Sequence, residues 1–402
     1  MEPTPPRTTG GFATRAVHGA TVPPVGQHPV SVPIHPSATW GTATSAEVGD
    51  LLTDEVAGYV YGRYDNPTST ALHAVIGSLH EAPAAWSAAS GTAAIHAVLD
   101  VLRGEGRVLA TAMLYGGTWA LLRRLERDAG WKVDHAPLLT AADLRAALTD
   151  EHTVVHVETI ANPSTAIADI PAIAAVCQER GVELVVDNTF ASPVLCRPVT
   201  LGATAVVESA TKFLGGHGDV VAGVVAGSDE LVGRVREHVY ELGGSLGPFE
   251  AWLVVRGIQT LALRVRQASA NATAVAAELA AAPRGVVAVH HPSLDAHPQH
   301  AMVPTMLSGL PGALLAVDLG SRPAAEAFAD ACRVFVRAAS LGGTHSLVLH
   351  PASTSHRQLR DDELRLAGLG PGTVRLSVGV EETEDLVADV RHALAAADDH
   401  AA

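Results

Sequence analysis

The sequence predicts an α/β protein in two parts: a large domain built on a mostly parallel sheet, and a smaller C-terminal α/β domain. Two observations support this prediction. Between about residues 71 and 226, short runs rich in β-branched residues alternate with helical stretches of about ten to fifteen residues, a pattern typical of βαβ units. In addition, the 402 residues exceed the roughly 250–300 that a single hydrophobic core usually organises.

Residues 1–60, before the first β run, are rich in proline, threonine and glycine and hold only short strand-like pieces. They lack the apolar periodicity of a core-forming element, so we expect an arm that lies against another surface. Residues 61–255 follow as the large domain. Runs of β residues separated by helices predict a parallel sheet covered on both faces. The runs are RVLATAML, TVVHVET, VELVVD, AVVES and VVAGVVAG.

Residues 256–402 are expected to form the smaller domain. The segment from Pro248 to Pro283 is consistent with one long helix or with two helices in succession, and it connects the two domains. Beyond it, the β runs VVAVHHP and GALLAVDLG, a helix around AAEAFADACRVF, the loop SLGGTHS, the strand VRLSVG and a closing helix complete an α/β pattern.

Composition excludes several classes of function. A formal net charge of −15 without a basic patch argues against nucleic-acid binding. The apolar runs end before the ~18 residues of a membrane span, and the N-terminus MEPTPPRTTGG lacks the apolar stretch of a signal peptide. Three scattered cysteines, Cys177, Cys196 and Cys332, fit a reducing compartment, so we expect a cytoplasmic protein. The loop HHPSLDAHPQH lacks metal-ligand spacing, and no metal site is expected.

Lysine is rare in this chain, because only Lys132 and Lys212 occur. Lys132 lies in the short stretch GWKVD after an arginine-rich helix and is predicted to be a solvated surface charge. Lys212 lies in TAVVESATKFLGGHGD, where an apolar β run ends in hydroxyls and glycines. We therefore expect a strand to deliver the Lys212 amine into a loop beside groups that can bind phosphate.

Further polar residues follow other predicted strands, and ligands of an open parallel sheet bind beyond the carboxyl ends of its strands. Gly91 and Thr92 open a helix directly after AAWSAAS, Asp187 ends VELVVD, and Ser209 and Thr211 lie at the end of AVVES. Singly, such residues are equally well explained as helix caps and turns. Together, an amine for an aldehyde, an acid for a ring nitrogen and a cradle for a phosphate are what pyridoxal phosphate requires.

With these residues in place, the chain resembles, over nearly its full length, the Cys/Met-metabolism family of pyridoxal phosphate enzymes, which includes cystathionine γ-synthase, cystathionine γ-lyase and methionine γ-lyase. The resemblance implies a pyridoxal-phosphate-dependent transferase fold of type I. The matching blocks are YGRYDNPTS at 61–69, SGTAAI at 90–95, YGGT at 115–118, ETIANPS at 158–164, VVDNTFASP at 185–193, SATKFLGGHGD at 209–219, LGPFEAWLVVRGIQTLALR at 246–264, SLGG at 340–343 and RLSVGVE at 375–381.

The resemblance implies a role for each candidate residue around the cofactor. Lys212 would form the Schiff base with the pyridoxal aldehyde, Asp187 would pair with the pyridinium nitrogen, and Tyr115 would stack on the ring. The phosphate would be bound by four residues of the same subunit, namely Gly91, Thr92, Ser209 and Thr211.

The resemblance also implies a site for the substrate carboxylate. Arg375, helped by Ser340 and Asn162, would hold it, because a guanidinium offers a carboxylate two parallel hydrogen bonds. Without the family context, an arginine on an alternating strand is usually solvated. The role of Glu158 stays open between support of the ring region and a plain charge at a strand end.

Assembly follows from the same resemblance. Active sites of this family are shared across a dimer, and two dimers form a tetramer. Tyr61 and Arg63 would therefore reach the phosphate of a neighbouring subunit, and the arm 1–60 would contact that subunit. Outside this context, Tyr61 and Tyr115 are equally well explained as half-buried aromatic residues.

The implied reaction takes place at the γ carbon of a sulfur or homoserine-derived amino acid. Lys212 would remove the α proton, and Tyr115 would assist the departure of the leaving group. We favour a carbon–sulfur γ-lyase; a γ-replacement enzyme of the cystathionine γ-synthase or O-acylhomoserine sulfhydrylase type is the alternative. The choice of substrate stays open, because five positions depart from the family pattern: Gly117, Glu208, Phe213, Gly218 and His345.

Two remote alternatives belong to other classes. Ser209-Ala-Thr-Lys212 matches the SxxK motif of serine acyl-enzymes, but the chain has no KTG element, which that chemistry also uses. A binding module on a degenerate scaffold of the same fold is the other alternative. The presence of both Lys212 and Asp187 argues against it.

Overall fold

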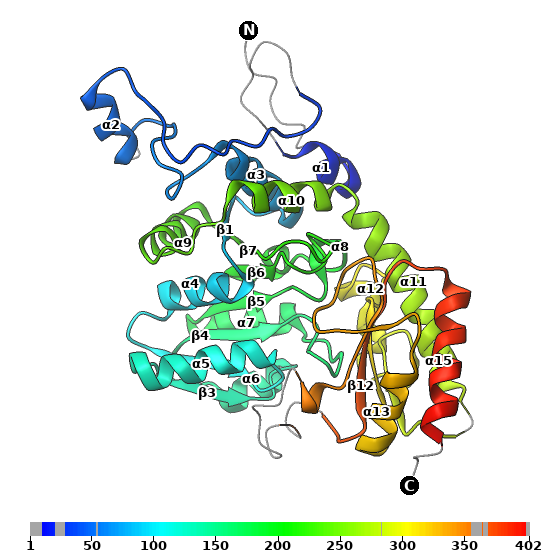
Figure 1. Ribbon diagram of the computed structural model, residues 1–402. Helices are drawn as coiled ribbons and strands as arrows, with labels where there is room; N and C mark the ends of the chain where they lie inside the picture. Colours follow the sequence, from blue (N-terminus) through cyan, green and yellow to red (C-terminus); the bar gives the residue numbers. More distant parts are fainter. Residues whose placement is uncertain are drawn as a thin grey trace.

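A computed structural model of the chain shows two adjoining parts, each with its own sheet (Figure 1). The larger sheet lies in the part coloured cyan to green, and the smaller one in the part coloured yellow to red. The predicted fold class, a large and mostly parallel domain followed by a smaller α/β domain, is confirmed. The structure describes residues 10–20, 29–53, 55–282, 284–354, 364 and 369–398.

Among the described residues, the larger sheet has seven strands in the order β1-β7-β6-β5-β4-β2-β3. Only β7 runs antiparallel to its two neighbours. The carboxyl ends of the other strands therefore meet at one edge, where ligands of open sheets bind. The strands are β1 (Ala84–Ala88), β2 (Arg107–Thr111), β3 (Val133–Ala136), β4 (His152–Glu158), β5 (Glu183–Asp187), β6 (Ala205–Ser209) and β7 (Gly223–Gly227).

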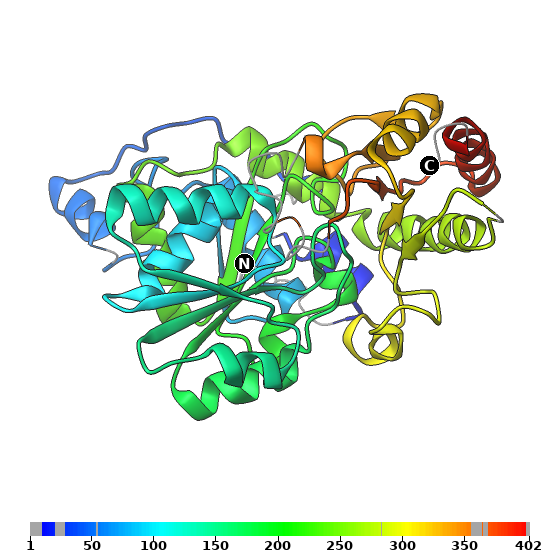
Figure 2. The same ribbon diagram turned by 90° about the horizontal axis from the view of Figure 1, so that it is seen from below.

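Helices cover both faces of the larger sheet (Figure 2), as valine-rich strands buried on both sides require. Helices α4, α5 and α9 pack on one face, and α3, α7 and α10 pack on the other. Their bounds are α3 (Pro67–His80), α4 (Gly91–Arg103), α5 (Gly116–Ala129), α7 (Ile170–Arg180), α9 (Asp229–Glu241) and α10 (Pro248–Ile258), with shorter helices α6 (Ala141–Ala147) and α8 (Ser192–Leu195) and the 3-10 turn Pro198–Leu201.

The smaller sheet has five described strands in the order β10-β11-β12-β9-β8. It packs against helices α11, α13 and α15 around the buried rings of Phe328 and Phe335. The strands are β8 (Ala288–His290), β9 (Leu314–Asp318), β10 (Val336–Arg337), β11 (Leu347–Leu349) and β12 (Thr373–Ser377). The helices are α11 (Leu261–Ala280), α12 (Val303–Met306), α13 (Arg322–Ala331) and α15 (Thr383–Asp398), with 3-10 turns at His300–Met302 and Pro351–Ser353.

The predicted connector consists of two helices in succession, α10 and α11, separated by Gln259 and Thr260. Helix α11 ends at Ala280, and Pro283, the expected end, lies outside the described residues. The expected domain boundary at residue 255 falls inside α10. The division into 61–255 and 256–402 stays a prediction.

The described part of the N-terminal arm holds two helices. Helix α1 (Phe12–His18) packs on α3 and buries Ala16. Helix α2 (Ser45–Leu52) has no buried residue and extends away from the rest of the chain in Figure 1. An arm that buries so little within its own chain leaves its surface free, but the contact of residues 1–60 with another subunit stays a prediction.

Three features of the described residues bear on the expected function classes. No described helix combines the length and the apolar character needed to cross a bilayer. In the same part of the chain, no three His, Cys, Asp or Glu side chains gather as a metal site. Cys177, Cys196 and Cys332 are free and buried.

Candidate active site

A cavity of about 250 Å³ lies at the carboxyl edge of the larger sheet. Residues that follow β1, β2, β4, β5 and β6 line one side, and residues 339–341, 349 and 375 of the smaller domain line the other. The structure therefore brings together two regions that are far apart in the sequence. Ten of the twelve predicted site residues line this cavity: Gly91, Thr92, Tyr115, Asn162, Asp187, Ser209, Thr211, Lys212, Ser340 and Arg375.

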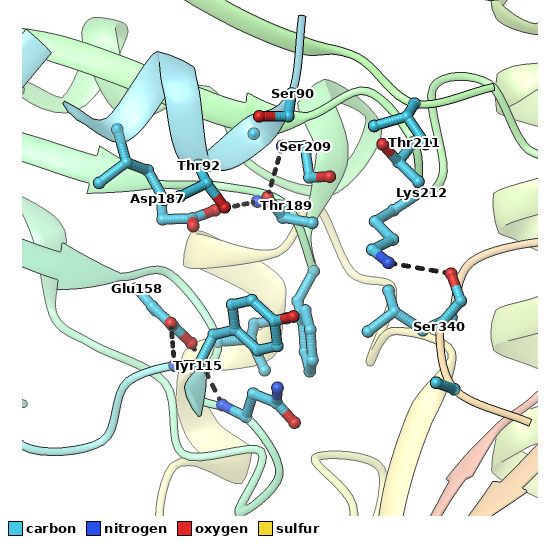
Figure 3. Close-up of a pocket in the computed structure, with 18 of the residues that line it drawn as sticks. Ser90, Thr92, Tyr115, Glu158, Asp187, Thr189, Ser209, Thr211, Lys212 and Ser340 are labelled. Carbon is cyan, nitrogen blue, oxygen red and sulfur yellow. Dashed lines mark hydrogen bonds between the residues drawn. The ribbon is translucent and has the colours of Figure 1, made fainter. Parts of the chain in front are cut away.

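Lys212 lies in the turn after β6, and its side chain enters the cavity (Figure 3). Its Nζ donates a hydrogen bond to Ser340 Oγ at 2.9 Å. Burial, followed by the charge of Arg375, lowers the pKa of Lys212 to about 8. A substantial fraction of the amine is therefore neutral near physiological pH, as a nucleophile or a base requires. Lys132, in contrast, is exposed, as predicted.

Asp187 ends β5 and is buried, with 9 % of its surface exposed. Its Oδ1 accepts the backbone N–H of Thr189 at 2.9 Å. Burial raises the pKa of Asp187 to about 6, hydrogen bonds from Thr189 oppose this shift, and the charge of Glu208 adds to it. No described side chain forms an ion pair with Asp187, which suits a carboxylate whose partner is a cationic ligand.

The N-terminus of helix α4 lies at the cavity. Ser90 caps the helix by accepting the N–H of Ala93 at 3.1 Å, which leaves the N–H groups of Gly91 and Thr92 outside the hydrogen bonds of the helix. A Cβ at Gly91 would lie 2.8 Å from Ser209 Cβ, so glycine lets the helix terminus pack against the turn after β6. Free N–H groups and the helix dipole make this terminus a good anion site.

Hydroxyl groups complete the edge of this anion site. The Ser209 N–H donates to Thr189 Oγ1 at 2.8 Å, which ties the turn after β6 to the turn after β5. The Thr211 hydroxyl already donates to the Ala222 carbonyl at 3.2 Å and accepts the Ala222 N–H at 3.1 Å. Thr211 is therefore held in place, and a phosphate would have to share or displace one of these bonds.

Arg375 lies on β12 and is buried, with 3 % of its surface exposed, so the alternative of a solvated arginine is wrong. It donates to Asn162 Oδ1 at 3.2 Å and to the Ser340 carbonyl at 2.7 Å. Burial lowers the pKa of Arg375 to about 10. Arg375 Nε and Asn162 Nδ2 are buried and have no hydrogen-bond partner among the described residues. A carboxylate that binds here could accept hydrogen bonds from both donors and pair with the charge of the guanidinium.

Ser340 joins the lysine and the arginine. Its φ of 99° lies in a region that residues with a side chain rarely adopt. In this conformation its hydroxyl accepts from Lys212 while its carbonyl accepts from Arg375. Backbone strain of this kind persists where the surroundings hold it in place, and it clusters at functional sites.

Tyr115 precedes helix α5 and lies at the mouth of the cavity, with 44 % of its surface exposed. Its backbone N–H donates to Glu158 Oε1 at 2.7 Å. A Cβ at Gly117 would collide with the Tyr115 ring, so glycine at 117 leaves room for the ring in this position.

Tyr61 and Arg63 do not line the cavity of their own chain. Arg63 donates to the Tyr240 carbonyl at 2.7 Å, and its guanidinium lies 4.7 Å from the centroid of the Tyr64 ring and 5.7 Å from that of the Tyr61 ring. The structure therefore places these two residues in an exposed aromatic cluster, and their role toward a cofactor stays a prediction.

Some lining residues were absent from the predicted set. Thr189, which links Asp187 to Ser209, follows β5 by two residues and could have been found by reading further along that strand end. Phe190 and Ile160 line the cavity as apolar residues and carry no comparable signal in the sequence. Glu158, left open by the sequence, is buried and lines the cavity.

Comparison with known proteins decides the family. The model of the Cys/Met metabolism PLP-dependent enzyme family matches residues 13–395. The chain belongs to this family. It is 40% identical to the L-methionine gamma-lyase of Pseudomonas putida over 96% of this chain and 98% of the relative. It is 38% identical to the cystathionine gamma-synthase of Mycobacterium bovis over 96% and 97% of the two chains. A solved cystathionine gamma-lyase of Micromonospora echinospora matches with a TM-score of 0.88, 39% identity and coverage of 96% and 100%.

Membership in the Cys/Met metabolism family makes the chain a pyridoxal-phosphate-dependent enzyme of fold type I. The cavity fits this cofactor on three independent counts. Among the described residues, the N–H groups of the α4 terminus lie outside the helix hydrogen bonds and are available to a phosphate, Asp187 is a buried carboxylate without a cationic partner, and Lys212 offers a partly neutral amine. Membership also sets aside the serine acyl-enzyme and the non-catalytic binding module.

The other departures from the family pattern lie around the cavity. Glu208 is 2 % exposed; it accepts the Asn188 amide at 2.8 Å and lies 3.3 Å from His80 Nε2, so it belongs to a buried cluster behind Asp187. Phe213 is buried beneath the SLGG loop. Gly218 and His345 line a neighbouring, more exposed cavity of about 550 Å³ that shares Ser340 with the first.

Proposed function

We propose that this family member is a carbon–sulfur γ-lyase that acts on a sulfur-containing amino acid. The observation that carries the proposal is one wall of the cavity, where a partly neutral Lys212 lies beside a buried Arg375 that has no carboxylate partner among the described residues. A base and a carboxylate receptor that both bond to Ser340 suit an α-amino acid. The relatives named as methionine and cystathionine γ-lyases support the same reaction class.

Pyridoxal phosphate, when bound, supplies an aldehyde for the substrate amino group and a cationic ring that accepts electrons. Around it, we assign Asp187 the task of keeping the ring nitrogen protonated, because a buried carboxylate gains most from a cationic neighbour. Gly91, Thr92 and Ser209 would hold the phosphate through N–H and hydroxyl groups, with Thr211 at its edge.

Proton transfer falls to two side chains. Lys212, once free, would take the α proton of the substrate and, after passing it on, a β proton, because departure of a γ substituent requires the loss of both; its pKa of about 8 lets it act as a base near physiological pH. Tyr115 would donate a proton to the departing sulfur, since its phenol lies at the mouth of the cavity. Ser340 would orient the amine through the hydrogen bond that it accepts.

The substrate carboxylate would bind Arg375. The unpaired Nε of Arg375 and the unpaired Nδ2 of Asn162 are donors that a carboxylate would satisfy. The hydrogen bonds from Arg375 to Asn162 and Ser340 fix the guanidinium before the substrate arrives, which reduces the ordering cost of binding.

Elimination and replacement differ in whether water reaches the site. Val221 at the cavity wall is 60% exposed, and the neighbouring cavity that shares Ser340 is open to solvent along His217, Asp219 and His345. Access of water through this opening would favour completion of an elimination if the neighbouring subunit of the proposed dimer leaves the opening free. A γ-replacement reaction stays the second candidate, because similarity extends to a cystathionine gamma-synthase and to an O-succinylhomoserine sulfhydrylase.

The test incubates the purified protein with cystathionine, methionine, and O-acetyl- and O-succinylhomoserine, each with and without cysteine, and identifies the products by mass spectrometry. A lyase releases a 2-oxo acid from a sulfur amino acid, with no gain from an added thiol. Formation of cystathionine from an acylhomoserine and cysteine would overturn the lyase in favour of replacement.

We also propose a homotetramer in which two dimers pair and each dimer shares its active sites. Tyr61 and Arg63 lie away from the cavity of their own chain, as expected of residues that serve a neighbouring one. Mixed subunits test this proposal: Arg63→Ala and Lys212→Ala proteins, each inactive alone, should recover part of the activity when mixed. Unchanged inactivity after proven subunit exchange contradicts it.

A cytoplasmic location is part of the same proposal. It is supported by three free, buried cysteines, which fit a reducing compartment. Fractionation of cells that express the tagged protein at native level tests it. Recovery in a membrane or secreted fraction contradicts the location and leaves the chemistry untouched.

A further inference from the structure

Glu158 is the last residue of β4, and its side chain is buried, with 6 % of the residue exposed. Its two carboxylate oxygens reach two different loops (Figure 3). Oε1 accepts the backbone N–H of Tyr115 at 2.7 Å, and Oε2 accepts the backbone N–H of Asn162 at 3.3 Å. One carboxylate therefore spans the loop after β2 and the loop after β4.

The two loops carry different parts of the proposed machinery. Tyr115 presents its ring at the mouth of the cavity, where the reacting end of a substrate would lie. Asn162 accepts a hydrogen bond from Arg375 at 3.2 Å and keeps an unpaired amide nitrogen. The bonds of Glu158 thus connect the proposed proton donor to the proposed carboxylate receptor through three contacts.

A carboxylate is a costly choice for holding two loops at this position. Among the described residues, no Lys, Arg or His forms an ion pair with Glu158, and its register partner on β5 is Asp187, another buried carboxylate. Burial, followed by the charge of Asp187, raises the pKa of Glu158 well above its usual value, although both N–H bonds oppose the shift. Burying a carboxylate without a cation is unfavourable, so a purely structural clamp gains nothing from the charge.

We propose that Glu158 is a positioning residue for the reaction: it fixes the Tyr115 and Asn162 loops at one separation, so that the phenol and the carboxylate receptor engage the same substrate. The inference rests on the proposed function for the identity of the reaction and on the two hydrogen bonds for the linkage. A side chain with only one acceptor oxygen cannot hold both N–H groups, because each bond uses a different oxygen.

The test compares Glu158→Gln with a matched control, Asp389→Asn, in the complete holoenzyme. Asp389 is 5 % exposed, accepts the backbone N–H groups of Arg333, Val334 and Phe335 at 2.8 to 3.0 Å, and does not line the cavity. Both changes remove a buried carboxylate that holds a loop. Both should therefore lower the melting temperature, and only the change at residue 158 should affect the site.

We expect Glu158→Gln to lower kcat and to raise KM together, with a fall in kcat/KM of about 10²-fold, the usual effect of displaced reacting groups. The circular dichroism of the bound cofactor should change as the Tyr115 ring shifts. In the cofactor-free protein, amide exchange in Glu158→Gln should accelerate at one of Tyr115 and Asn162, because glutamine keeps one acceptor oxygen, and in Glu158→Ala it should accelerate at both. Glu158→Asp, whose shorter side chain reaches one loop, should restore slow exchange at one amide only.

Three outcomes would overturn the inference. The first is a loss of stability like that of Asp389→Asn with unchanged cofactor dichroism and kcat/KM. The second is faster exchange in Glu158→Ala at only one of the two amides or at neither, and the third is a wild-type kcat/KM in Glu158→Asp. Amide exchange and dichroism separate this inference from the proposed function. If the wild-type protein acts on none of the tested amino acids, the lyase proposal fails while these two readouts still decide whether Glu158 links the loops.

Discussion

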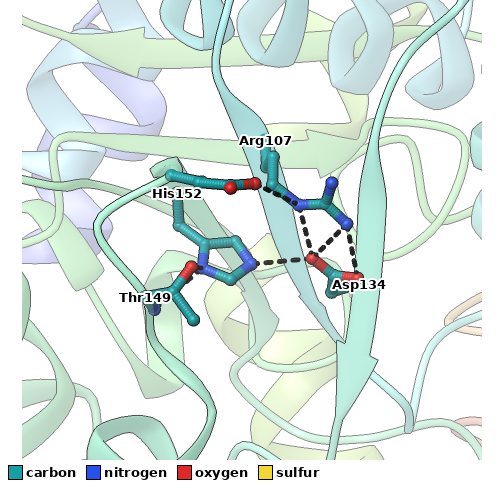
Figure 4. Close-up of polar contacts among 5 residues, drawn as sticks. Arg107, Asp134, Thr149 and His152 are labelled. Atoms are coloured by element: carbon teal, nitrogen blue, oxygen red, sulfur yellow. Dashed lines mark hydrogen bonds and ion pairs between the residues drawn. The ribbon is translucent and has the colours of Figure 1, made fainter.

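The two edges of the larger sheet differ in how they treat charge. At the carboxyl edge, Asp187 and Arg375 are buried and Lys212 is half-buried, and none of the three has an oppositely charged partner among the described residues. At the opposite edge, where β2, β3 and β4 begin, Arg107, Asp134, His152 and Thr149 form a closed polar cluster (Figure 4). Charges without a charged partner therefore lie at the carboxyl ends of β5 and β6, facing Arg375 of β12, and a paired set lies where β2, β3 and β4 begin.

Hydrogen bonds link each side chain of the closed cluster to the next. Arg107 makes two hydrogen bonds of 2.8 Å to the two oxygens of Asp134, and His152 Nε2 lies 3.0 Å from Asp134 Oδ2. The Thr149 N–H donates to His152 Nδ1 at 3.0 Å, so Nε2 is the nitrogen that donates to Asp134. A Thr–His–Asp sequence of contacts resembles a catalytic relay, but Arg107 neutralises the acid and none of these residues lines the active-site cavity.

Unpaired hydrogen-bonding groups and charges distinguish a ligand site from a structural polar cluster. A polar cluster that completes its own hydrogen bonds stabilises the fold and has no free group for a ligand. A cluster that leaves buried donors and charges without partners lowers the stability of the fold, and packing elsewhere in the protein offsets this loss. Binding of a ligand with complementary charge removes the unfavourable desolvation free energy. Substitutions at the carboxyl edge should therefore change activity, whereas substitutions at the opposite edge should change stability.

The largest effect is expected for Lys212→Ala. Loss of the amine removes both the cofactor attachment point and the base, so activity should fall by at least the ~10²–10⁴-fold typical of one acid–base group. After borohydride treatment, mass spectrometry should find the cofactor on a peptide containing residue 212 in the wild type and on no peptide in the variant. The exposed lysine serves as the control, because Lys132→Ala should keep both activity and labelling. Cofactor trapped elsewhere in Lys212→Ala would contradict the assignment.

Arg375→Lys should have the next largest effect. Lysine keeps the charge but cannot form the paired bonds of a guanidinium, so binding of the substrate carboxylate should weaken by about 1.5–3 kcal/mol, or roughly 10–150-fold in KM. Arg107→Lys is the matched control, since Arg107 also makes paired bonds, but to Asp134 at the other edge. Steady-state kinetics of the two variants decide. Equal KM values for both would show that Arg375 does not bind the carboxylate.

A smaller effect concerns pH. Because burial and Arg375 lower the pKa of Lys212 to about 8, the neutral amine increases about tenfold per pH unit below that value and then levels off. The rate at which the cofactor-free protein takes up pyridoxal phosphate covalently should follow this curve, monitored by absorbance. Arg375→Met removes a cation and should move the midpoint upward. A wild-type midpoint near the ordinary lysine value of 10.5 would contradict the buried, partly neutral amine.

The sequence predicted the site residues at the carboxyl edge of the larger sheet better than those that the smaller domain contributes. Asp187, Gly91 and Lys212 were found from a general rule, since each follows a strand whose apolar run is readable in the sequence. Arg375 and Ser340 come from the smaller domain, and periodicity alone assigned Arg375 to solvent; only the resemblance to the family placed both beside the substrate. Their positions depend on how two domains dock, which no local pattern encodes.

No feature of the sequence predicted the closed cluster. Its hydrogen bonds join residues 18 and 27 positions apart, across three strands whose register is set by packing. The same holds for the pair of loops on Glu158, where the contact with Tyr115 spans 43 positions. Strand ends can be predicted one at a time, whereas partners across strands require the register of the sheet.

The smallest effect is expected at the closed cluster. Asp134→Asn removes one carboxylate oxygen from the bonds with Arg107 and His152, and because the Asp134 side chain is 43% exposed, the loss of stability should be no more than about 1 kcal/mol. Activity should stay within about twofold, since none of the four residues reaches the cavity. Urea unfolding and the lyase assay on the same preparation measure both.

The pH dependence of that small loss gives the cluster its own signature. Partial burial raises the pKa of Asp134, but hydrogen bonds from Arg107 and His152 outweigh it, so the pKa lies below the ordinary 3.8. A carboxylate with a lowered pKa stabilises the folded state above its ordinary value, and this contribution is lost as the pH falls through the lowered one. The difference between wild type and Asp134→Asn should therefore be fully present above pH 3.8 and shrink as the pH falls below that value. A difference that stays constant across this range would mean that the charge of Asp134 contributes nothing and that only its shape matters.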